Sequence, residues 1–305
     1  MHESAEEDLR NVFLRFWREE YNASQHHYLR TYLYSLLRIG RQGHGSIRNY
    51  FMGLRSIEDI RRFQRERKDP GNAPPMRALP LAYVPEAAGE RLRLCIANAD
   101  STHPHPKARM ASYLLAVAGE YMMLRSPPED AAGVIQHCIK WGSTLESRAS
   151  SAFCRETLRY LASVDDLKDY HDYGPKQEGL PLNVLCGPVP NKWLQVGAWG
   201  RGFSGYGMPV SSMHTLGVVL YLVKFHRGSM DALRHSMWIG GDVDSIGALV
   251  LGIIGGRRGL RFSNYPPSEV EDDSDEDLPW WMLEQLEAVE HLASVSERFE
   301  RVCAS

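Results

Sequence analysis

The sequence lacks long apolar runs, and its cysteines are few. No stretch of roughly 18 consecutive apolar residues occurs, so no transmembrane helix is expected. No apolar run follows Met1, so no signal peptide is expected either. The five cysteines are scattered and include no C-x-x-C pair, which argues against a redox or zinc motif and suits a reducing compartment. We therefore expect a cytoplasmic protein with no membrane partner.

The net charge is also small. A formal charge of -3 creates no strong field toward nucleic acid or an anionic membrane, so direct nucleic-acid binding is not indicated. The chain of 305 residues is 43% hydrophobic, which supplies enough apolar surface for one large core. We expect a single domain over residues 1–305.

Sustained alternation of apolar and polar residues is absent as well, whereas helical spacing is frequent. Apolar residues recur at three- and four-residue intervals from Pro106 to Leu124, which predicts one buried stripe on one helix. Comparable patterns cover residues 6–20, 28–39, 88–99, 131–141, 152–162, 212–225, 230–238 and 279–303. The predicted fold class is all-α.

Two segments break the helical pattern. Residues 165–207 are rich in Gly, Pro, Asp and Tyr, and we expect this irregular segment to lie over a site. Residues 266–278 are acidic and contain little apolar content, which predicts a solvated linker to the last helix.

The segment GGDVDSIG (240–247) precedes a small, apolar run. Two glycines permit a tight backbone entry, and Asp242, Asp244 and Ser245 place three oxygen ligands at the start of a helix. Such a grouping suits a hard cation such as Mg²⁺. An ordinary helix cap by Asp or Ser is the alternative.

The segment GNAPPMR (71–77) contains a Gly-Asn step that can open a helix and direct backbone amides at an anion such as a phosphate. An ordinary loop before a helix is the alternative interpretation. The segment THPHP (102–106) places a proline at a first helical turn and leaves His103 and His105 just before it. For either histidine taken singly, a surface or capping role is expected.

Taken together and in this order, four segments resemble the ADP-ribosylglycohydrolase family, which includes the dinitrogenase-reductase-activating glycohydrolases. They are GNAPPMR, THPHP, GYGMPVSSMHTLGVVLYLV (205–223) and GGDVDSIGALVLGIIGG (240–256). The likeness is strongest over residues 45–260. It implies a compact orthogonal multi-helix bundle, with two Mg²⁺ ions in a cleft that binds ADP-ribose. The implied reaction is hydrolysis of the bond between ADP-ribose and an acceptor, and the implied partner is ADP-ribose or an ADP-ribosylated protein.

The resemblance also implies roles for individual residues. The family's metal ligands fall on Asp242, Asp244 and Ser245, and the two aspartates are also the catalytic candidates. Its phosphate-binding loop falls on Gly71, Asn72, Ala73, Pro74, Pro75, Met76 and Arg77. Its substrate-contacting histidine falls on His103, and Gly205, Tyr206 and Gly207 would lie near the nucleoside.

Two features depart from the family pattern. The family carries a Thr-Asp-Asp motif on an early helix, and no such motif precedes Gly71. The cluster Glu6–Asp8 lacks the threonine and is interpreted as a solvated helix start. The second departure is Pro74 and Pro75, since proline offers no amide hydrogen to a phosphate.

These departures leave two functions open. The first is an ADP-ribosyl hydrolase with impaired turnover that holds at most one Mg²⁺. The second is a pseudoenzyme, which would bind ADP-ribose without turnover or have a structural role, as in the crystallin-like relatives.

Overall fold

In the computed structural model, helices account for nearly all the regular structure of the described residues. These residues are 9–15, 18, 50, 53–84, 89–125, 130–149, 152–173, 182–186, 210–258, 262–263, 278–279, 282 and 289–303. Two strands of two residues each, β1 (Phe262–Ser263) and β2 (Leu278–Pro279), pair in parallel. They are too short to alter the fold class, and the predicted all-α fold is confirmed. No helix in the described part of the chain is long and apolar enough to cross a membrane.

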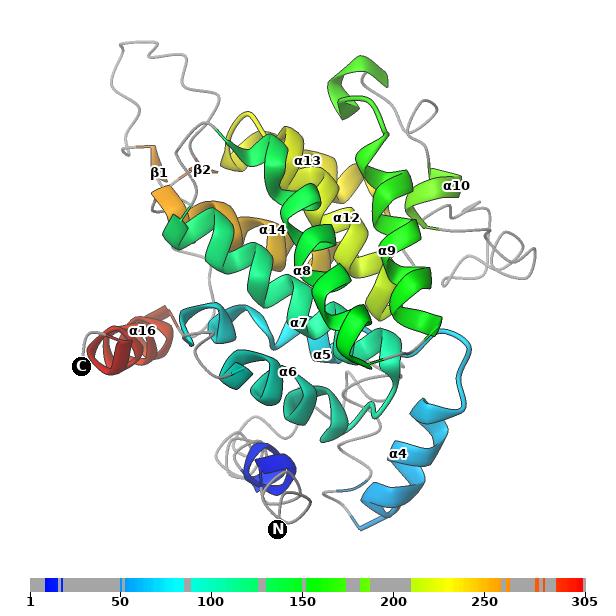
Figure 1. The fold of residues 1–305 in the computed structure, drawn as a ribbon. Coiled ribbons are helices and arrows are strands. Elements are labelled where there is room, and N and C mark those ends of the chain that lie inside the picture. Colours follow the sequence, from blue (N-terminus) through cyan, green and yellow to red (C-terminus); the bar gives the residue numbers. More distant parts are fainter. Residues whose placement is uncertain are drawn as a thin grey trace, which may run out of the picture.

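Figure 1 shows the arrangement of the helices. In chain order they are α4 (Ile57–Arg65), α5 (Ala73–Met76), η2 (Leu79–Tyr83), α6 (Glu90–Asp100), α7 (Pro106–Glu120), η4 (Tyr121–Arg125), η5 (Ala131–Gly133), α8 (Val134–Ala149), α9 (Ala152–Asp165), η6 (Tyr170–Tyr173), α10 (Leu182–Leu185), α12 (Ser212–Phe225), α13 (Ser229–Ile239), α14 (Val243–Arg258) and α16 (Val289–Cys303). The segment predicted at residues 28–39 lies outside the described residues.

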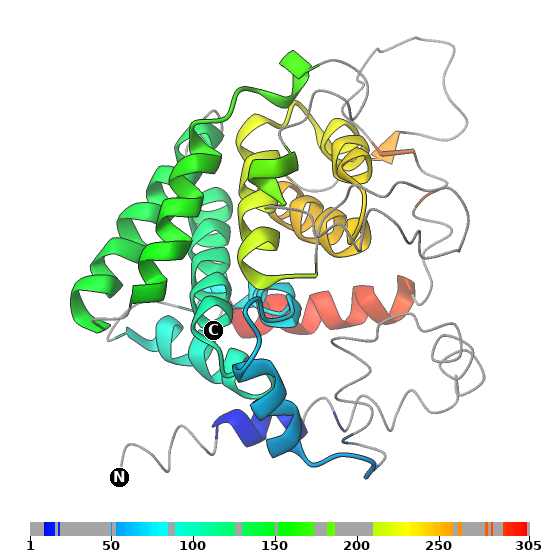
Figure 2. The same cartoon turned by 90° about the vertical axis from the view of Figure 1, so that its right-hand side faces the viewer.

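Helix α7 is the centre of the bundle. It begins at Pro106, as predicted, and the Nδ1 atom of His105 accepts the backbone N–H of Lys107 at 3.0 Å. Every residue from Met110 to Glu120 is buried, so the predicted single stripe is wrong. The reason is that α5, α6, η2, α8, α9 and α12 all pack against this one helix, as Figures 1 and 2 show.

Helix α12 is the second buried helix, and its bounds are those predicted. It packs against α7, α9 and α14, and Figure 2 shows it beside α7 along its length. A Cβ added at Gly217 would lie 2.3 Å from the ring of Tyr160, so α9 approaches α12 through this glycine. The Tyr160 hydroxyl donates to the Leu185 carbonyl at 2.7 Å, which attaches α10 to the same contact.

A buried ion pair joins the first turn of α6 to the end of α7. Arg91 donates to the carboxylate of Glu120, and the two side chains are 2% and 6% exposed. Arg91 also donates to the carbonyl of Val84. Because the pair is shielded from water, both charges depend on each other for compensation.

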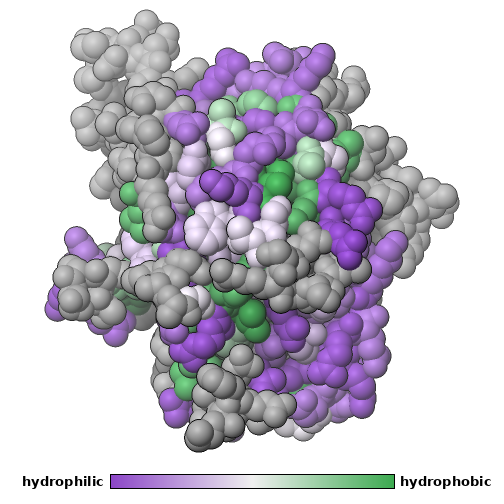
Figure 3. Space-filling model, viewed as in Figure 1, coloured by the Kyte–Doolittle hydropathy of each residue, from purple (hydrophilic) through white to green (hydrophobic). Residues whose placement is uncertain are grey.

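The surface contrasts with this interior. On the face shown in Figure 3, the described residues are mostly hydrophilic, and apolar side chains are exposed only in small patches. Helix α16 packs at the edge, where the rings of Phe299 and Tyr83 meet edge to face with centroids 5.2 Å apart. This helix begins at Val289, and Pro279, its predicted start, lies in β2 instead. The predicted acidic linker lies outside the described residues apart from Leu278.

Candidate active site

The residues Asp242, Asp244 and Ser245 lie at the start of α14, as predicted. Gly240 and Gly241 precede them with φ angles of 73° and 76°, a backbone region that glycine favours because it has no Cβ. The Asp242 carbonyl accepts the amide of Ile246 at 3.2 Å, which makes Asp242 the backbone cap of α14. The capping interpretation therefore holds for its main chain, and its side chain remains available for other partners.

The Asp242 side chain is half-buried and faces polar groups from two segments. Burial raises the pKa of its carboxyl, hydrogen bonds from Asn72 and Ser245 oppose this rise, and the nearby Asp244 charge adds to it. Asp244 itself is exposed and Ser245 is buried. The carboxylate of Asp242 therefore has the side chains of Asp244 and Ser245 as neighbours, and a cation there would relieve the repulsion between the two carboxylates.

The loop at Gly71–Arg77 meets this motif. The side-chain amide of Asn72 donates to the Asp242 carboxylate and to the Thr215 hydroxyl, the latter at 3.1 Å. The hydroxyl of Ser245 lies 3.3 Å from the sulfur of Met76. The fold therefore brings together two segments that the sequence singled out independently.

Most backbone groups of this loop are already engaged. The amide of Gly71 donates to Gln64 at 3.3 Å, and the carbonyl of Gly71 accepts the Ser212 hydroxyl at 2.5 Å. Pro74 and Pro75 have no amide hydrogen, and the amides of residues 76 and 77 donate within the loop. The remaining amides of the predicted phosphate-binding loop are those of residues 72 and 73.

Arg77 points away from the aspartates. Its guanidinium donates to the side chain and carbonyl of Asn98 and to the Thr102 hydroxyl, each at 3.1 Å. Burial lowers its pKa to about 9. Asn98 in turn donates to the Pro74 carbonyl at 3.0 Å, so Arg77 and Asn98 together attach the loop to the end of α6.

His103 is buried beside the same loop. It is only 1% exposed, so the surface or capping role expected for it is wrong, whereas His105 does cap α7. Its Nδ1 atom lies 2.7 Å from the Thr102 hydroxyl, and its Nε2 atom has no hydrogen-bond partner in the described part of the structure. A Cβ added at Gly71 would lie 2.9 Å from that Nε2 atom.

The ionisation state of His103 follows from this environment. Burial, followed by the neighbouring charges of Arg77 and Arg67, holds its pKa well below the ordinary histidine value. The ring is therefore neutral at pH 7. A buried polar nitrogen without a partner costs about 1–3 kcal/mol, which a bound ligand atom or a water would offset.

The sequence prediction missed the residues that support the loop. Thr215, Ser212 and Gln64 all contact Gly71 or Asn72. A signal was present, because Ser212 and Thr215 are polar residues in the first turn of a largely apolar helix. Gly205, Tyr206 and Gly207, predicted near the nucleoside, lie outside the described residues.

The donor set at α14 fits a hard cation. Asp242 and Asp244 supply carboxylate oxygens and Ser245 a hydroxyl, which are the ligand types that Mg²⁺ prefers. Burial is the main cause of the raised pKa of Asp242, and the neighbouring Asp244 carboxylate adds to it.

Comparison with known proteins gives one match. No curated protein and no solved structure matches the chain. The sequence model of the ADP-ribosylglycohydrolase family matches residues 2–303, nearly the whole length. The order of the motifs, the all-α fold and this match agree, and the chain belongs to the ADP-ribosylglycohydrolase family.

Proposed function

We propose that this protein binds ADP-ribose between the Gly71–Arg77 loop and the start of α14, and that it hydrolyses the bond from ADP-ribose to an acceptor with the help of Mg²⁺. The contact between Asn72 and Asp242 carries the proposal. It places the predicted phosphate-binding loop directly against the predicted metal ligands. A ligand with a ribose beside a diphosphate would need those two features to be adjacent.

The loop and the histidine would position the ligand. The amides of residues 72 and 73 are at the start of α5, where a diphosphate oxygen could accept hydrogen bonds. The Nε2 atom of the neutral His103 is buried at the base of the loop and could exchange a hydrogen bond with a ribose hydroxyl or a water.

The aspartates would carry the chemistry. Hydrolysis adds water at the anomeric carbon while the acceptor leaves with a proton, and positive charge develops on the ribose. The half-buried carboxylate of Asp242, at the point where the loop meets α14, would accept the proton of the attacking water as general base. The exposed carboxylate of Asp244 would stabilise the developing positive charge.

Mg²⁺ would be held by Asp242, Asp244 and Ser245. When bound, it would lower the pKa of a coordinated water and orient the ribose hydroxyls. Asn72 donates to Oδ2 of Asp242, which leaves Oδ1 of this carboxylate as a ligand for the ion.

Binding of ADP-ribose without turnover is the second candidate function. The carboxylate of Asp242 is already satisfied by Asn72 and Ser245, and two prolines reduce the number of amides in the loop. A site in that state can recognise the ligand even if no cation is held.

One experiment separates the two functions. ADP-ribose is titrated calorimetrically with and without Mg²⁺, and release of ADP-ribose from ADP-ribosylated arginine and serine peptides is measured in parallel. Hydrolase activity predicts tighter binding with Mg²⁺ and release that depends on it. Binding without release supports the second function, and absence of binding under both conditions contradicts both.

A further inference from the structure

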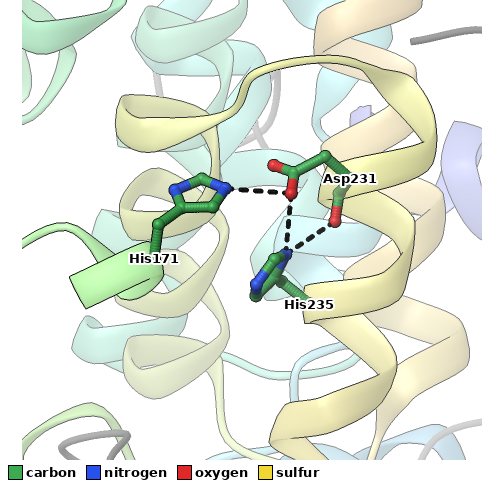
Figure 4. Close-up of side chains that lie close together, drawn as sticks. All are labelled: His171, Asp231 and His235. Atoms are coloured by element: carbon green, nitrogen blue, oxygen red, sulfur yellow. Dashed lines mark hydrogen bonds and ion pairs between the residues drawn. The ribbon is translucent and has the colours of Figure 1, made fainter. Parts of the chain in front are cut away.

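We propose that His171, Asp231 and His235 form a binding site for a divalent transition-metal ion of the Zn²⁺ class, separate from the ADP-ribose site and independent of the proposed function. Figure 4 shows the three side chains converging from η6 and from the first turns of α13. One ligand atom from each lies within 4.8 Å of the other two.

The distances suit one ion. The Nε2 atom of His171 is 2.9 Å from Oδ1 of Asp231, and the Nδ1 atom of His235 is 3.2 Å from the same oxygen. In a tetrahedral site with bonds of about 2.0–2.1 Å, neighbouring ligand atoms lie about 3.3 Å apart. The two imidazole nitrogens lie within 4.8 Å of each other, so they would approach by up to about 1.5 Å to share an ion.

The outer contacts are those of a metal site. The Nδ1–H of His171 donates to Oδ1 of Asp169 at 2.5 Å, which directs Nε2 toward the centre. A histidine that binds a metal usually donates its other N–H to a carboxylate or carbonyl in this way. The other oxygen of Asp231 accepts the Tyr170 hydroxyl at 3.0 Å and the Arg227 amide at 3.3 Å. Only Oδ1 is therefore directed at both imidazoles.

The ring of His235 can turn its Nδ1 atom toward an ion without leaving the Asp231 carbonyl unpaired. Its Nδ1 atom now lies 2.8 Å from the Asp231 carbonyl. Within a helix that carbonyl also accepts the amide of the residue four positions on, so it keeps a partner when the imidazole leaves. Rings pack on both histidines, with Tyr170 centroids 4.3 Å from His171 and 4.2 Å from His235.

The ligand types identify the class of ion. Two imidazoles and one carboxylate suit Zn²⁺, whereas Mg²⁺ prefers oxygen ligands alone. The His171, Asp231 and His235 side chains are 17%, 21% and 8% exposed, so water can reach a fourth position. Binding would displace any proton on the two ring nitrogens that face the ion, and it would tie η6 to α13.

This site is distinct from the aspartates at α14. Asp231 lies near the beginning of α13, and Gly240 lies just beyond its end. The eight residue steps from Asp231 to Ile239 rise about 12 Å along the helix axis. An ion at each end would therefore occupy its own ligand set.

The test uses the full chain after removal of metals by a chelator. In excess Mg²⁺, which occupies the oxygen site, Zn²⁺ is titrated calorimetrically and Co²⁺ is followed by its visible absorption. We expect one Zn²⁺ per chain, an intense visible Co²⁺ band typical of four or five ligands, and a rise in the unfolding temperature with Zn²⁺. Absence of both the band and the Zn²⁺ shift in the wild-type chain overturns the proposal, whatever the variants do.

Variants locate the ion. Asp231→Asn keeps the shape of the side chain but removes its charge, and His171→Gln removes one imidazole. Each of these two single variants should lower the Zn²⁺ affinity by at least about 100-fold. Asp169→Asn, which acts through His171, should lower it by about 10- to 100-fold. His137→Gln on α8 is the control and should leave the affinity unchanged, as should Asp242→Asn. Equal Zn²⁺ affinity in wild type and Asp231→Asn would show that the three residues form only a hydrogen-bonded clamp.

Discussion

The side-chain amide of Asn72 donates to the carboxylate of Asp242, across 170 positions of the chain. Neither residue is fully exposed, and the contact joins the short helix α5 to the start of α14. The hydrogen bond from the neutral Asn72 amide partly offsets the rise in the pKa of Asp242 that burial causes.

Replacing this amide with a carboxylate should weaken ligand binding. In Asn72→Asp a negative charge would face both Asp242 and the diphosphate, and the affinity for ADP-ribose without Mg²⁺ should fall by at least about tenfold, or 1.4 kcal/mol. Calorimetric titration measures the change. Ser143→Asp adds the same charge on the exposed face of α8 and should have no effect. Equal affinity in wild type and Asn72→Asp would show that this loop is not the binding loop.

The aspartates should control the response to Mg²⁺. In Asp242→Ala and in Asp244→Ala, ADP-ribose should bind with the same affinity in the presence and absence of Mg²⁺. Each variant keeps two of the three protein ligands, and two ligands alone do not hold this ion well. Titration of each variant with and without the ion gives the answer. Asp166→Ala, an exposed carboxylate at the end of α9, is the control. A full Mg²⁺ response in either variant would place the ion elsewhere.

The affinity for Mg²⁺ should fall on acidification sooner than at an ordinary carboxylate site. The pKa of Asp242 is raised, so this carboxyl takes up a proton at a higher pH than usual, and the protonated form does not bind the ion. A series of titrations between pH 4 and 8 would show the fall. Asp244→Asn removes the neighbouring charge, and in this variant the protonation midpoint of the Asp242 carboxyl, followed by NMR without Mg²⁺, should lie at lower pH than in the wild type. A midpoint that stays in place would exclude Asp244 as a cause.

Breaking the buried ion pair should cost much more stability than breaking an exposed one. Glu120→Gln leaves the Arg91 charge without its counterion, and the free energy of unfolding should fall by about 3–5 kcal/mol. Arg93→Gln breaks the ion pair between Arg93 and Glu90, whose two side chains are 40% and 43% exposed. This change should lower the free energy of unfolding by about 0–1 kcal/mol. Urea denaturation compares them. Similar losses in the two variants would mean that Arg91 finds another partner.

Local patterns predicted the helices well where they carry start and stop signals. Helix α12 has the predicted bounds, and α7 begins at the predicted proline. The continuous burial of α7 could not be read from its spacing, because small residues such as Ala111 and Ala116 are compatible with either an exposed or a buried face. Which faces are covered depends on neighbours that lie far along the chain.

The site was predictable only in its parts. Gly240 and Gly241 before Asp242 identify a helix start from the sequence alone. The burial of His103 does not follow from its own motif, because it results from the contact with Gly71. The cluster of His171, Asp231 and His235 was missed for the same reason: the first residue is about 60 positions from the others.

The enclosure of α7 has a consequence for hydrogen exchange. Its backbone amides are covered by helices on every side, so small local fluctuations do not expose them to solvent. They should exchange only when the whole bundle opens, which makes them reporters of global stability. Because His105 caps this helix and His103 lies two residues before the cap, one wall of the candidate site is attached to the helix that we expect to exchange most slowly among the described residues.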